Sequence, residues 1–258
     1  MQNKKHWRLS ELSLPDVSSQ IPKVVVLPFG ATEPHGRHLP YGTDIIEVEA
    51  IAERSCQLAN ECGVDVAYLP VIPFGVQTSQ QSYPLAMNLY PSTLNQIISD
   101  LTESMDNSGI EKAVLLNGHG GNDFYMHLKE LFGKRRVYLT QVNWFSLCQE
   151  LAGEIFAPGG DHANDMETSL VLHLCPELVD MAGAGSQPTA KFRLAAMRAG
   201  WARAPRPWDR YTEDSGAGDP RSATAEKGEQ FFNAICKELA DFLVELAGAN
   251  IDDKFPFC

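Results

Sequence analysis

Residues 24–36 read VVVLPFGATEPHG, and residues 113–122 read AVLLNGHGGN. Each stretch begins with a short apolar run that is typical of a buried β-strand, and each then passes into a glycine-containing turn that carries a histidine. In open α/β sheets, ligands and catalytic groups gather beyond the carboxyl ends of the strands. Two such turns therefore predict one site that is assembled from separate strand ends.

The rest of the chain alternates between the spacing of strands and the spacing of helices. Apolar runs predict strands at 64–70 and 136–142, besides those at 23–28 and 113–117. Apolar residues three and four apart, flanked by capping and stop residues, predict the helices. This order predicts an α/β protein with a mostly parallel central sheet that is covered by helices on both faces. The predicted helices span 44–60, 92–108, 122–132, 165–174 and 223–247.

One segment departs from this alternation. Residues 183–222 are rich in glycine, proline, alanine and arginine, and they predict a long irregular excursion from a single domain that spans residues 1–258. Segments of this length in compact domains are usually lids, subunit contacts or disordered loops. We expect a lid or a subunit contact here.

The composition limits the class of protein. The chain has 258 residues, of which 44% are hydrophobic, enough for a large buried core. Its formal net charge of −12 argues against a nucleic-acid partner, because phosphate binding needs a basic face. No stretch approaches the ~20 apolar residues of a membrane helix, and the polar start at 1–10 lacks the apolar core of an export signal. We therefore expect a cytoplasmic protein that acts on a small molecule, without a membrane partner.

The cysteines are scattered and form no Cys-x-x-Cys pair, so neither a zinc hook nor a disulfide framework is expected. We expect reduced thiols that mostly fill the core, with the last one exposed at the terminus. The six are Cys56, Cys62, Cys148, Cys175, Cys236 and Cys258.

The first candidate ligands follow the first strand. In extended backbone, positions i and i+2 point to the same side, so Glu33 and His35 can face one site. Asp44 lies nine residues further on, at the predicted start of a helix, where the helix dipole favours a carboxylate that can bridge two cations. The plainer alternative is that Asp44 only caps its helix and His35 only satisfies loop backbone.

Two further clusters carry histidine or carboxylate. His119 lies between glycines that let the backbone approach a ligand closely; a phosphate cradle is the alternative, although the Lys-Ser or Lys-Thr of a Walker loop is absent. His162 precedes the helix predicted at 165–174, and Glu167 lies in its first turns. For Glu167 alone, a solvated first-turn acid is the plainer interpretation.

Taken together, two histidines and three carboxylates suit Zn²⁺, Mn²⁺ or Fe²⁺, with Zn²⁺ expected first. A bridging aspartate fits a pair of ions ~3.5–4 Å apart, which activates water and polarises a carbonyl. His162 is left as the proton carrier. The five expected ligands are Glu33, His35, Asp44, His119 and Glu167.

At this point the motifs resemble the creatininase (creatinine amidohydrolase) family. Any one of them is weak, but their order and spacing together are specific, and they span most of the chain. They are EPHG at 33–36, HLP at 38–40, TD at 43–44, NGHGGN at 117–122, HA at 162–163, ETS at 167–169, GDP at 218–220 and ATAEKG at 223–228.

The resemblance implies a three-layer α/β/α fold, two metal ions, and hydrolysis of a carbon–nitrogen bond in an amide. It implies Glu33, Asp44 and His119 on one ion, and His35, Asp44 and Glu167 on the other, with Asp44 bridging. It also implies His162 as a catalytic histidine, and a homo-oligomer, commonly a hexamer.

Two departures bear on the substrate. In the enzyme that gives the family its name, the position that matches Gly121 is a catalytic glutamate, so creatinine is in doubt as the substrate. The third motif usually runs His-Ala-Gly-Glu, whereas residues 162–165 here are HAND. The His-Gly-Gly-Asn form at residues 119–122 looks more like other branches of the family, including formamide hydrolases and enzymes that process a modified peptide.

We therefore expect a metal-dependent hydrolase of a small cyclic amide or formamide. Two alternatives come from other classes: a non-catalytic binding protein of the same fold, and a phosphate-binding transferase that uses the glycine-rich turn. The candidates for the walls of the substrate cavity are Trp144, Phe145, Trp201 and Trp208. For Trp144, a place in the core is the plainer interpretation.

Overall fold

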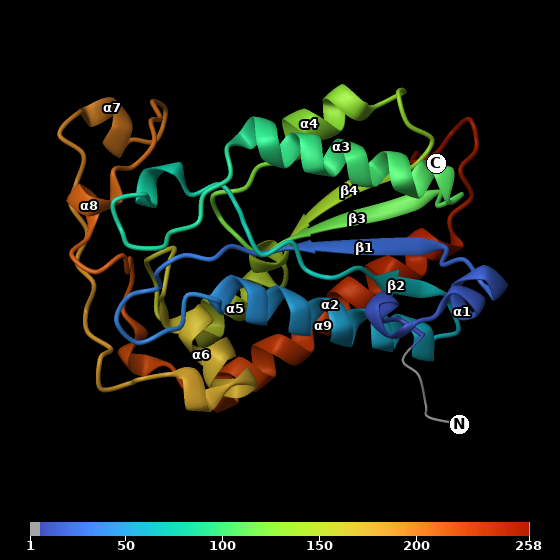
Figure 1. The fold of residues 1–258 in the computed structure, drawn as a ribbon. Coiled ribbons are helices and arrows are strands. Elements are labelled where there is room, and N and C mark those ends of the chain that lie inside the picture. Colours follow the sequence, from blue (N-terminus) through green and yellow to red (C-terminus); the bar gives the residue numbers. More distant parts are fainter. Residues whose placement is uncertain (1–5, 258) are drawn as a thin grey trace.

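The computed structural model describes residues 6–257 (Figure 1). Residues 1–5, which are half of the polar start at 1–10, lie outside the described part of the chain. Cys258, which we expected to be exposed, also lies outside it. Within residues 6–257, no helix is both long and apolar enough to cross a membrane.

A sheet of four parallel strands forms the centre of the molecule (Figure 1). Its order is β2-β1-β3-β4, and the pairings β1–β2, β1–β3 and β3–β4 are all parallel. The four predicted strands are therefore present, and the two that carry the histidine turns lie side by side in the middle. The strands are β1 (Val24–Phe29), β2 (Val66–Tyr68), β3 (Lys112–Asn117) and β4 (Tyr138–Asn143).

The central strands are apolar on both faces, because successive side chains point to opposite sides. In β1, Val24 and Val26 enter one hydrophobic core, whereas Val25 and Leu27 enter the other. Figure 1 shows α3 and α4 over one face of the sheet and α2, α6 and α9 over the other. The expected three-layer α/β/α fold is confirmed. The bounds of these helices are Thr43–Glu61 for α2, Pro91–Asn107 for α3, Tyr125–Leu131 for α4, Asp165–Leu174 for α6 and Ala225–Gly248 for α9.

Some details of the prediction were wrong. Helices α1 (Leu14–Ser19) and α5 (Gln149–Ile155) were not predicted, and both are too short to show a long periodic pattern. The Asp44 side chain does not cap α2, which begins at Thr43 behind Gly42 with no side-chain cap. That carboxylate is buried instead and faces histidines.

The excursion at 183–222 is largely irregular and lies beyond the carboxyl ends of the strands (Figure 1). Backbone bridges join Gln187 to Gly218 and His162 to Ala217, so this segment is tied to the loop that leads into α6. Its role as a lid or a subunit contact stays a prediction. Its short helices are α7 (Ala195–Arg198) and α8 (Trp208–Tyr211).

The described cysteines are free thiols. Cys56 and Cys236 are fully buried in the core, as expected, whereas Cys62 is exposed and Cys148 and Cys175 are partly buried.

Helix α6 holds Glu167 in place by packing closely on α9, and Gly228 makes this approach possible. A Cβ atom on Gly228 would overlap the carbonyl oxygen of Ser169 in α6. We expect Gly228→Ala to lower the free energy of unfolding by about 1–3 kcal/mol, the usual cost of overpacking. Urea denaturation measures this change. The matched control is Gly248→Ala at the end of the same helix, where an added Cβ meets nothing within 4 Å; equal stability of the two variants would contradict the prediction.

Candidate metal centre

The chain that leaves β1 delivers two ligand candidates to one place. Glu33 and His35 are both fully buried. The His35 Nδ1–H donates to the Glu33 backbone oxygen at 3.1 Å, so its Nε2 lone pair is turned toward Asp44. The Glu33 carboxylate is held through Oε2, which accepts a 2.6 Å hydrogen bond from Gln80 Nε2. Its Oε1 is left free for the site.

Asp44, from the first turn of α2, lies between two histidines. Its Oδ1 is 2.9 Å from His35 Nε2, and its Oδ2 is 3.1 Å from His119 Nδ1. The alternative in which Asp44 merely caps a helix is therefore wrong, because its two oxygens face two separate ligand candidates.

His119 enters from the glycine-rich turn after β3. Its Nδ1 is 2.9 Å from Glu33 Oε1, and its Nε2–H donates to the Val76 carbonyl at 2.9 Å. A backbone acceptor of this kind fixes the tautomer of a metal-ligating histidine and directs the other nitrogen at the ion.

Glu167 reaches the site from the start of α6. Asn164 caps this helix by accepting hydrogen bonds from the backbone N–H groups of Met166 and Glu167. The Glu167 Oε2 in turn accepts a hydrogen bond from the backbone N–H of Ala163. The HAND stretch thus positions Glu167, even though it departs from the usual motif.

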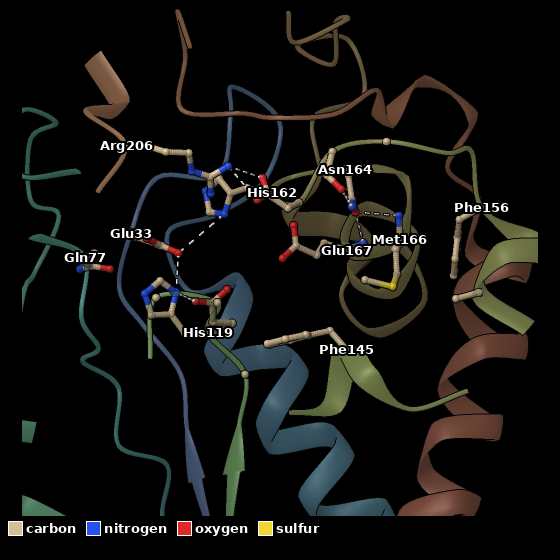
Figure 2. Close-up of a pocket in the computed structure, with 18 of the residues that line it drawn as sticks. Glu33, Gln77, His119, Phe145, Phe156, His162, Asn164, Met166, Glu167 and Arg206 are labelled. Carbon is tan, nitrogen blue, oxygen red and sulfur yellow. Dashed lines mark hydrogen bonds and ion pairs between the residues drawn. The ribbon is translucent and has the colours of Figure 1, made fainter. Parts of the chain in front are cut away.

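These residues form two triads that share Asp44. Glu33, Asp44 and His119 make one, and His35, Asp44 and Glu167 make the other, with the ligand atoms of each within 4.8 Å of one another. The structure therefore brings together all five residues that the sequence singled out, in the grouping that the resemblance implied. Figure 2 shows Glu33, His119 and Glu167 converging on one cavity.

The buried atoms at the centre fit a pair of cations. Glu33 Oε1, His35 Nε2 and Asp44 Oδ2 are buried and have no hydrogen-bond partner among the described residues. The facing nitrogen and oxygen atoms of these side chains and His119 lie 2.9–3.1 Å apart. Their lone pairs repel each other at this distance unless a proton or a cation lies between them. Imidazole nitrogens with carboxylate oxygens are donors that suit zinc, manganese and iron.

Without an ion, protons take the place of the cations. Burial lowers the pKa of His35, but Asp44 outweighs it, with help from Glu167, and the pKa rises to about 9. His119 behaves in the same way: Glu33 and Asp44 overcome its burial and raise its pKa well above the usual value. Burial raises the pKa of Glu167 to about 7. Burial also acts to raise the pKa of Asp44, but the two histidines hold it below its ordinary range.

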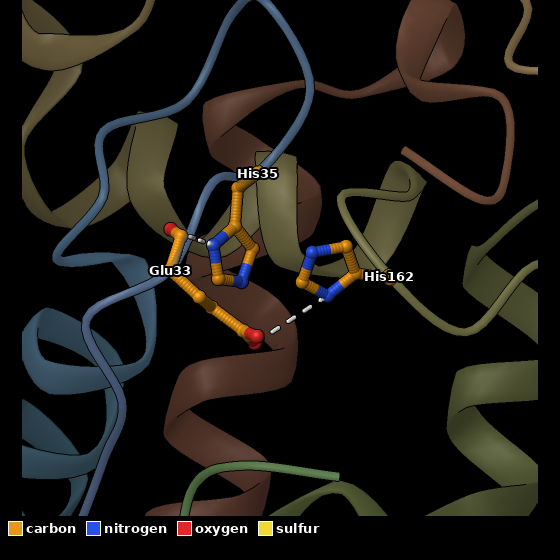
Figure 3. A group of neighbouring side chains, drawn as sticks. All are labelled: Glu33, His35 and His162. Atoms are coloured by element: carbon orange, nitrogen blue, oxygen red, sulfur yellow. Dashed lines mark hydrogen bonds and ion pairs between the residues drawn. The ribbon is translucent and has the colours of Figure 1, made fainter. Parts of the chain in front are cut away.

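His162 lies against the centre but is oriented differently from His35 and His119. Its Nε2–H donates to the Pro34 carbonyl at 2.9 Å, and its Nδ1 is 3.8 Å from Glu33 Oε1. Figure 3 shows its ring beside that of His35, with 4.1 Å between the ring centroids. Burial and the neighbouring His35 lower the pKa of His162 to about 4. Together with Glu33 and His35, it forms a third group whose ligand atoms lie within 4.8 Å of one another.

The centre opens into a cavity of about 670 Å³. Of the four aromatic residues expected as walls, Phe145 and Trp208 line it. Trp144 is 1% exposed in the core, and Trp201 is 78% exposed outside the cavity. The excursion therefore contributes a wall to the site through Trp208, whose ring meets the ring of His162 edge to face.

Sequence reasoning missed three polar residues near the centre. Gln80 ends a short 3-10 helix at Thr78–Gln80, Arg206 lies in the irregular excursion, and neither carried a recognisable motif. Glu47 belongs to no motif, yet it is fully buried, and its pKa is raised by burial and by Glu167 and Asp44. Its position three residues after Asp44, on the same face of α2, is the signal that could have revealed its burial.

The glycine at position 121 has a structural reason. A Cβ atom there would overlap the Val76 carbonyl oxygen and His119 Nε2, the two partners of the hydrogen bond that orients His119. The loop therefore has no room for a glutamate at this position unless that hydrogen bond is given up.

Comparison with known proteins identifies the family. A parallel sheet between two helical layers, with clustered histidines and carboxylates at its carboxyl edge, defines a metal-site α/β protein. The family model described as creatininase (creatinine amidohydrolase) matches residues 10–243. The chain belongs to the creatininase family.

Its relatives in sequence are hydrolases. The chain is 29% identical to the mycofactocin precursor peptide peptidase of Mycobacterium tuberculosis over 229 residues, which cover 84% of each protein. It is 28% identical to the creatinine amidohydrolase of Pseudomonas putida over 250 residues, which cover 86% of this chain and 89% of the relative.

Solved structures of similar fold also come from the creatininase family. A protein from Bacteroides fragilis, assigned as a creatinine amidohydrolase, superposes with a TM-score of 0.88 at 36% identity and covers 96% of this chain and 99% of its own. Structures of creatininase, among them a Zn–Zn form of a variant and a manganese form, share the fold with a TM-score of 0.79 at 23% identity; they cover 95% of this chain and 100% of their own.

The loop around Gly121 offers a test of the orienting hydrogen bond on His119. We expect Gly121→Ala to weaken zinc binding by about 10- to 100-fold, the usual effect of losing the partner that orients a ligand. Competition with a chromophoric chelator measures the affinity. Gly120→Ala is the control, because an added Cβ there meets nothing within 4 Å. Equal zinc affinities of the two variants would show that the Val76 contact does not orient His119.

The raised histidine pKa values predict that metal binding releases protons. The carboxylates raise the pKa of His35 to about 9 and that of His119 well above its ordinary value, which favours protonated imidazoles near neutral pH, whereas a divalent ion needs neutral ones. Protons therefore compete most strongly at low pH, and affinity should rise as the pH rises from about 6 to 8. Calorimetric titration with Zn²⁺ in buffers of different ionisation enthalpy should show release of at least two protons, because Glu167, with its pKa of about 7, adds a partial contribution to those of the two histidines. Binding without proton release would contradict this account.

Proposed function

We propose that this protein is a metal-dependent hydrolase that cleaves a carbon–nitrogen bond in a small amide, either a cyclic amide or a formamide. The observation that carries the proposal is the pair of ligand triads joined by Asp44 beside the cavity. The hydrolase activity of the relatives in the creatininase family supports it.

The five candidate ligands would hold two divalent ions, and zinc is the first candidate, with manganese or iron as alternatives. Glu33 and His119 would bind one ion, His35 and Glu167 the other, and Asp44 both. When bound, such a pair supplies an activated water and a Lewis acid that polarises the amide carbonyl. The two histidines and three carboxylates leave net positive charge for these tasks.

His162 has the geometry of a proton carrier. Because its Nε2–H is engaged by the Pro34 carbonyl, Nδ1 is the nitrogen that faces the centre. We assign this Nδ1 the transfer of a proton from the attacking water to the departing nitrogen. The packing of the His162 ring against His35 and Trp208 holds it in place for this step.

The loop at Gly121 and the size of the cavity bear on the substrate class. Creatinine is disfavoured, because the loop at Gly121 has no room for the glutamate that the family's name-giving enzyme carries there. A peptide bond is a second candidate, since the cavity of about 670 Å³ is roomy and a relative at 29% identity is a peptide peptidase. We also propose a homo-oligomer, by resemblance to the family.

Substitution of His119 and His162 separates metal binding from proton transfer. We expect His119→Ala to lose most of its bound metal, and His162→Ala to keep its metal but lose about 10²- to 10⁴-fold in turnover. Elemental analysis of purified protein measures the metal, and a panel of formamides, cyclic amides and dipeptides measures turnover. Unchanged metal content in His119→Ala would refute the metal centre.

The same panel decides between the remaining alternatives. Loss of metal from His162→Ala would make His162 a ligand rather than a proton carrier. Failure of the metal-loaded wild-type protein to hydrolyse any amide in the panel would favour a binding protein of the same fold.

A further inference from the structure

A single guanidinium faces the cavity from the irregular excursion. Among the described residues, Arg206 is the one lysine or arginine that lines the cavity. Its side chain is 31% exposed. In Figure 2 it lies toward the same side of the view as His162, away from Phe145 and Phe156.

The guanidinium is held in place but keeps hydrogen-bonding capacity. It lies over the rings of Trp208 and Tyr211, at 4.9 and 4.8 Å from their centroids. Its Nη1 contacts the Asp161 carboxylate at 2.8 Å. Within residues 6–257, no hydrogen bond engages its Nε or Nη2. Two donors of a planar fork, which match a carboxylate, therefore remain available.

The charges around the cavity leave Arg206 as the residue that can bind a negatively charged group. The carboxylates of Glu33, Asp44 and Glu167 are the proposed ligands of the metal ions, and Asp161 faces Nη1 alone. Among the described residues that line the cavity, Arg206 is therefore the one lysine or arginine that can pair with a negatively charged group of a substrate. One guanidinium suits a singly charged carboxylate better than a phosphate, which usually gathers several donors.

The position of Arg206 also selects which half of the substrate carries the anion. Trp208 contacts both Arg206 and His162, and the ring centroids of Trp208 and His162 are 4.9 Å apart. His162 is the proposed proton donor to the departing nitrogen, so Arg206 lies on the amine side of the bond to be cleaved. Across the cavity, Phe145, Phe156 and Met166 form an apolar wall that can take a hydrocarbon side chain.

We propose that Arg206 makes the site selective for N-acyl amino acids, amides whose nitrogen is attached to a carbon that bears a free carboxylate. This inference rests on the proposed amide hydrolysis and narrows its substrate class. Water adds across the amide: its oxygen bonds to the acyl carbon, the carbon–nitrogen bond breaks, and the nitrogen gains a proton. The products are a carboxylic acid and a free amino acid, and no oxidant or reductant is needed.

Two substrates that differ only in the carboxylate test the proposal. N-formyl-L-leucine and N-(3-methylbutyl)formamide share the amide and the hydrocarbon chain. With zinc-loaded wild-type protein, we expect kcat/KM to be about 10- to 100-fold higher for N-formyl-L-leucine, the effect of one charge-assisted, two-point contact. Arg206→Gln should remove this preference by lowering only the value for N-formyl-L-leucine. Arg206→Lys should restore part of it.

The control is Arg203→Gln, which removes an exposed arginine of the same segment that does not line the cavity. It should keep the wild-type preference. A preference that survives Arg206→Gln would overturn the proposal, because Arg206 would then not be the group that selects the carboxylate. Hydrolysis of both compounds at equal rates would also overturn it, while leaving the proposed hydrolase function intact.

Binding supplies a second measurement that does not depend on turnover. Calorimetry on the zinc-loaded protein compares the affinities for N-acetyl-L-leucine and N-(3-methylbutyl)acetamide, in wild type and in Arg206→Gln. Tighter binding of N-acetyl-L-leucine that is lost in the variant supports the carboxylate site even if hydrolysis fails, and equal binding refutes it. Absence of hydrolysis with the expected binding pattern would refute the proposed function alone.

Discussion

The site depends on the position of one carboxylate between two imidazoles. Asp44 faces His35 through one oxygen and His119 through the other, at 2.9 and 3.1 Å. These three side chains come from the turn after β1, the start of α2 and the turn after β3. They meet because β1 and β3 are neighbours in a parallel sheet, so their carboxyl ends open at the same edge. A sheet in which these strands were apart could not place Asp44 between the two histidines.

Backbone carbonyls orient all three histidines of the site. The carbonyls of Glu33, Val76 and Pro34 accept from His35, His119 and His162, and each fixes which ring nitrogen faces inward. His35 presents Nε2 to the centre, whereas His119 and His162 present Nδ1. This arrangement explains why close backbone approach is needed at Gly121: the loop that carries His119 must come near the strand-end segment at Val76. The preorganisation of ligands by such partners is part of the chemistry of a metal site.

The irregular segment at 183–222 contributes side chains to the wall of the cavity, whereas the candidate metal ligands lie at the carboxyl edge of the sheet. The candidate ligands lie at the edge of a parallel sheet, and loops over such an edge are free to vary. Here the excursion places Trp208 against His162 and brings a guanidinium to the mouth of the cavity. The excursion therefore supplies cavity residues that are separate from the five residues that would bind the metal.

The succession of strands and helices along the chain could be read from the sequence alone, since apolar runs of a few residues and apolar stripes at helical spacing are local patterns. The sequence also pointed to the five candidate ligands, because Glu33, His35 and His119 follow two predicted strands, whose carboxyl ends share an edge in a parallel sheet, and because Asp44 and Glu167 lie at the starts of predicted helices. It missed the short helices α1 and α5, and it gave no indication of Glu47. Only the tertiary structure decided that Glu47 is buried and that Gln80 supports Glu33. The same holds for Arg206 and Trp208, which reach the cavity from a segment without periodic pattern. The physical reason is that such contacts join residues far apart in the chain, and irregular loops take their course from packing rather than from local spacing.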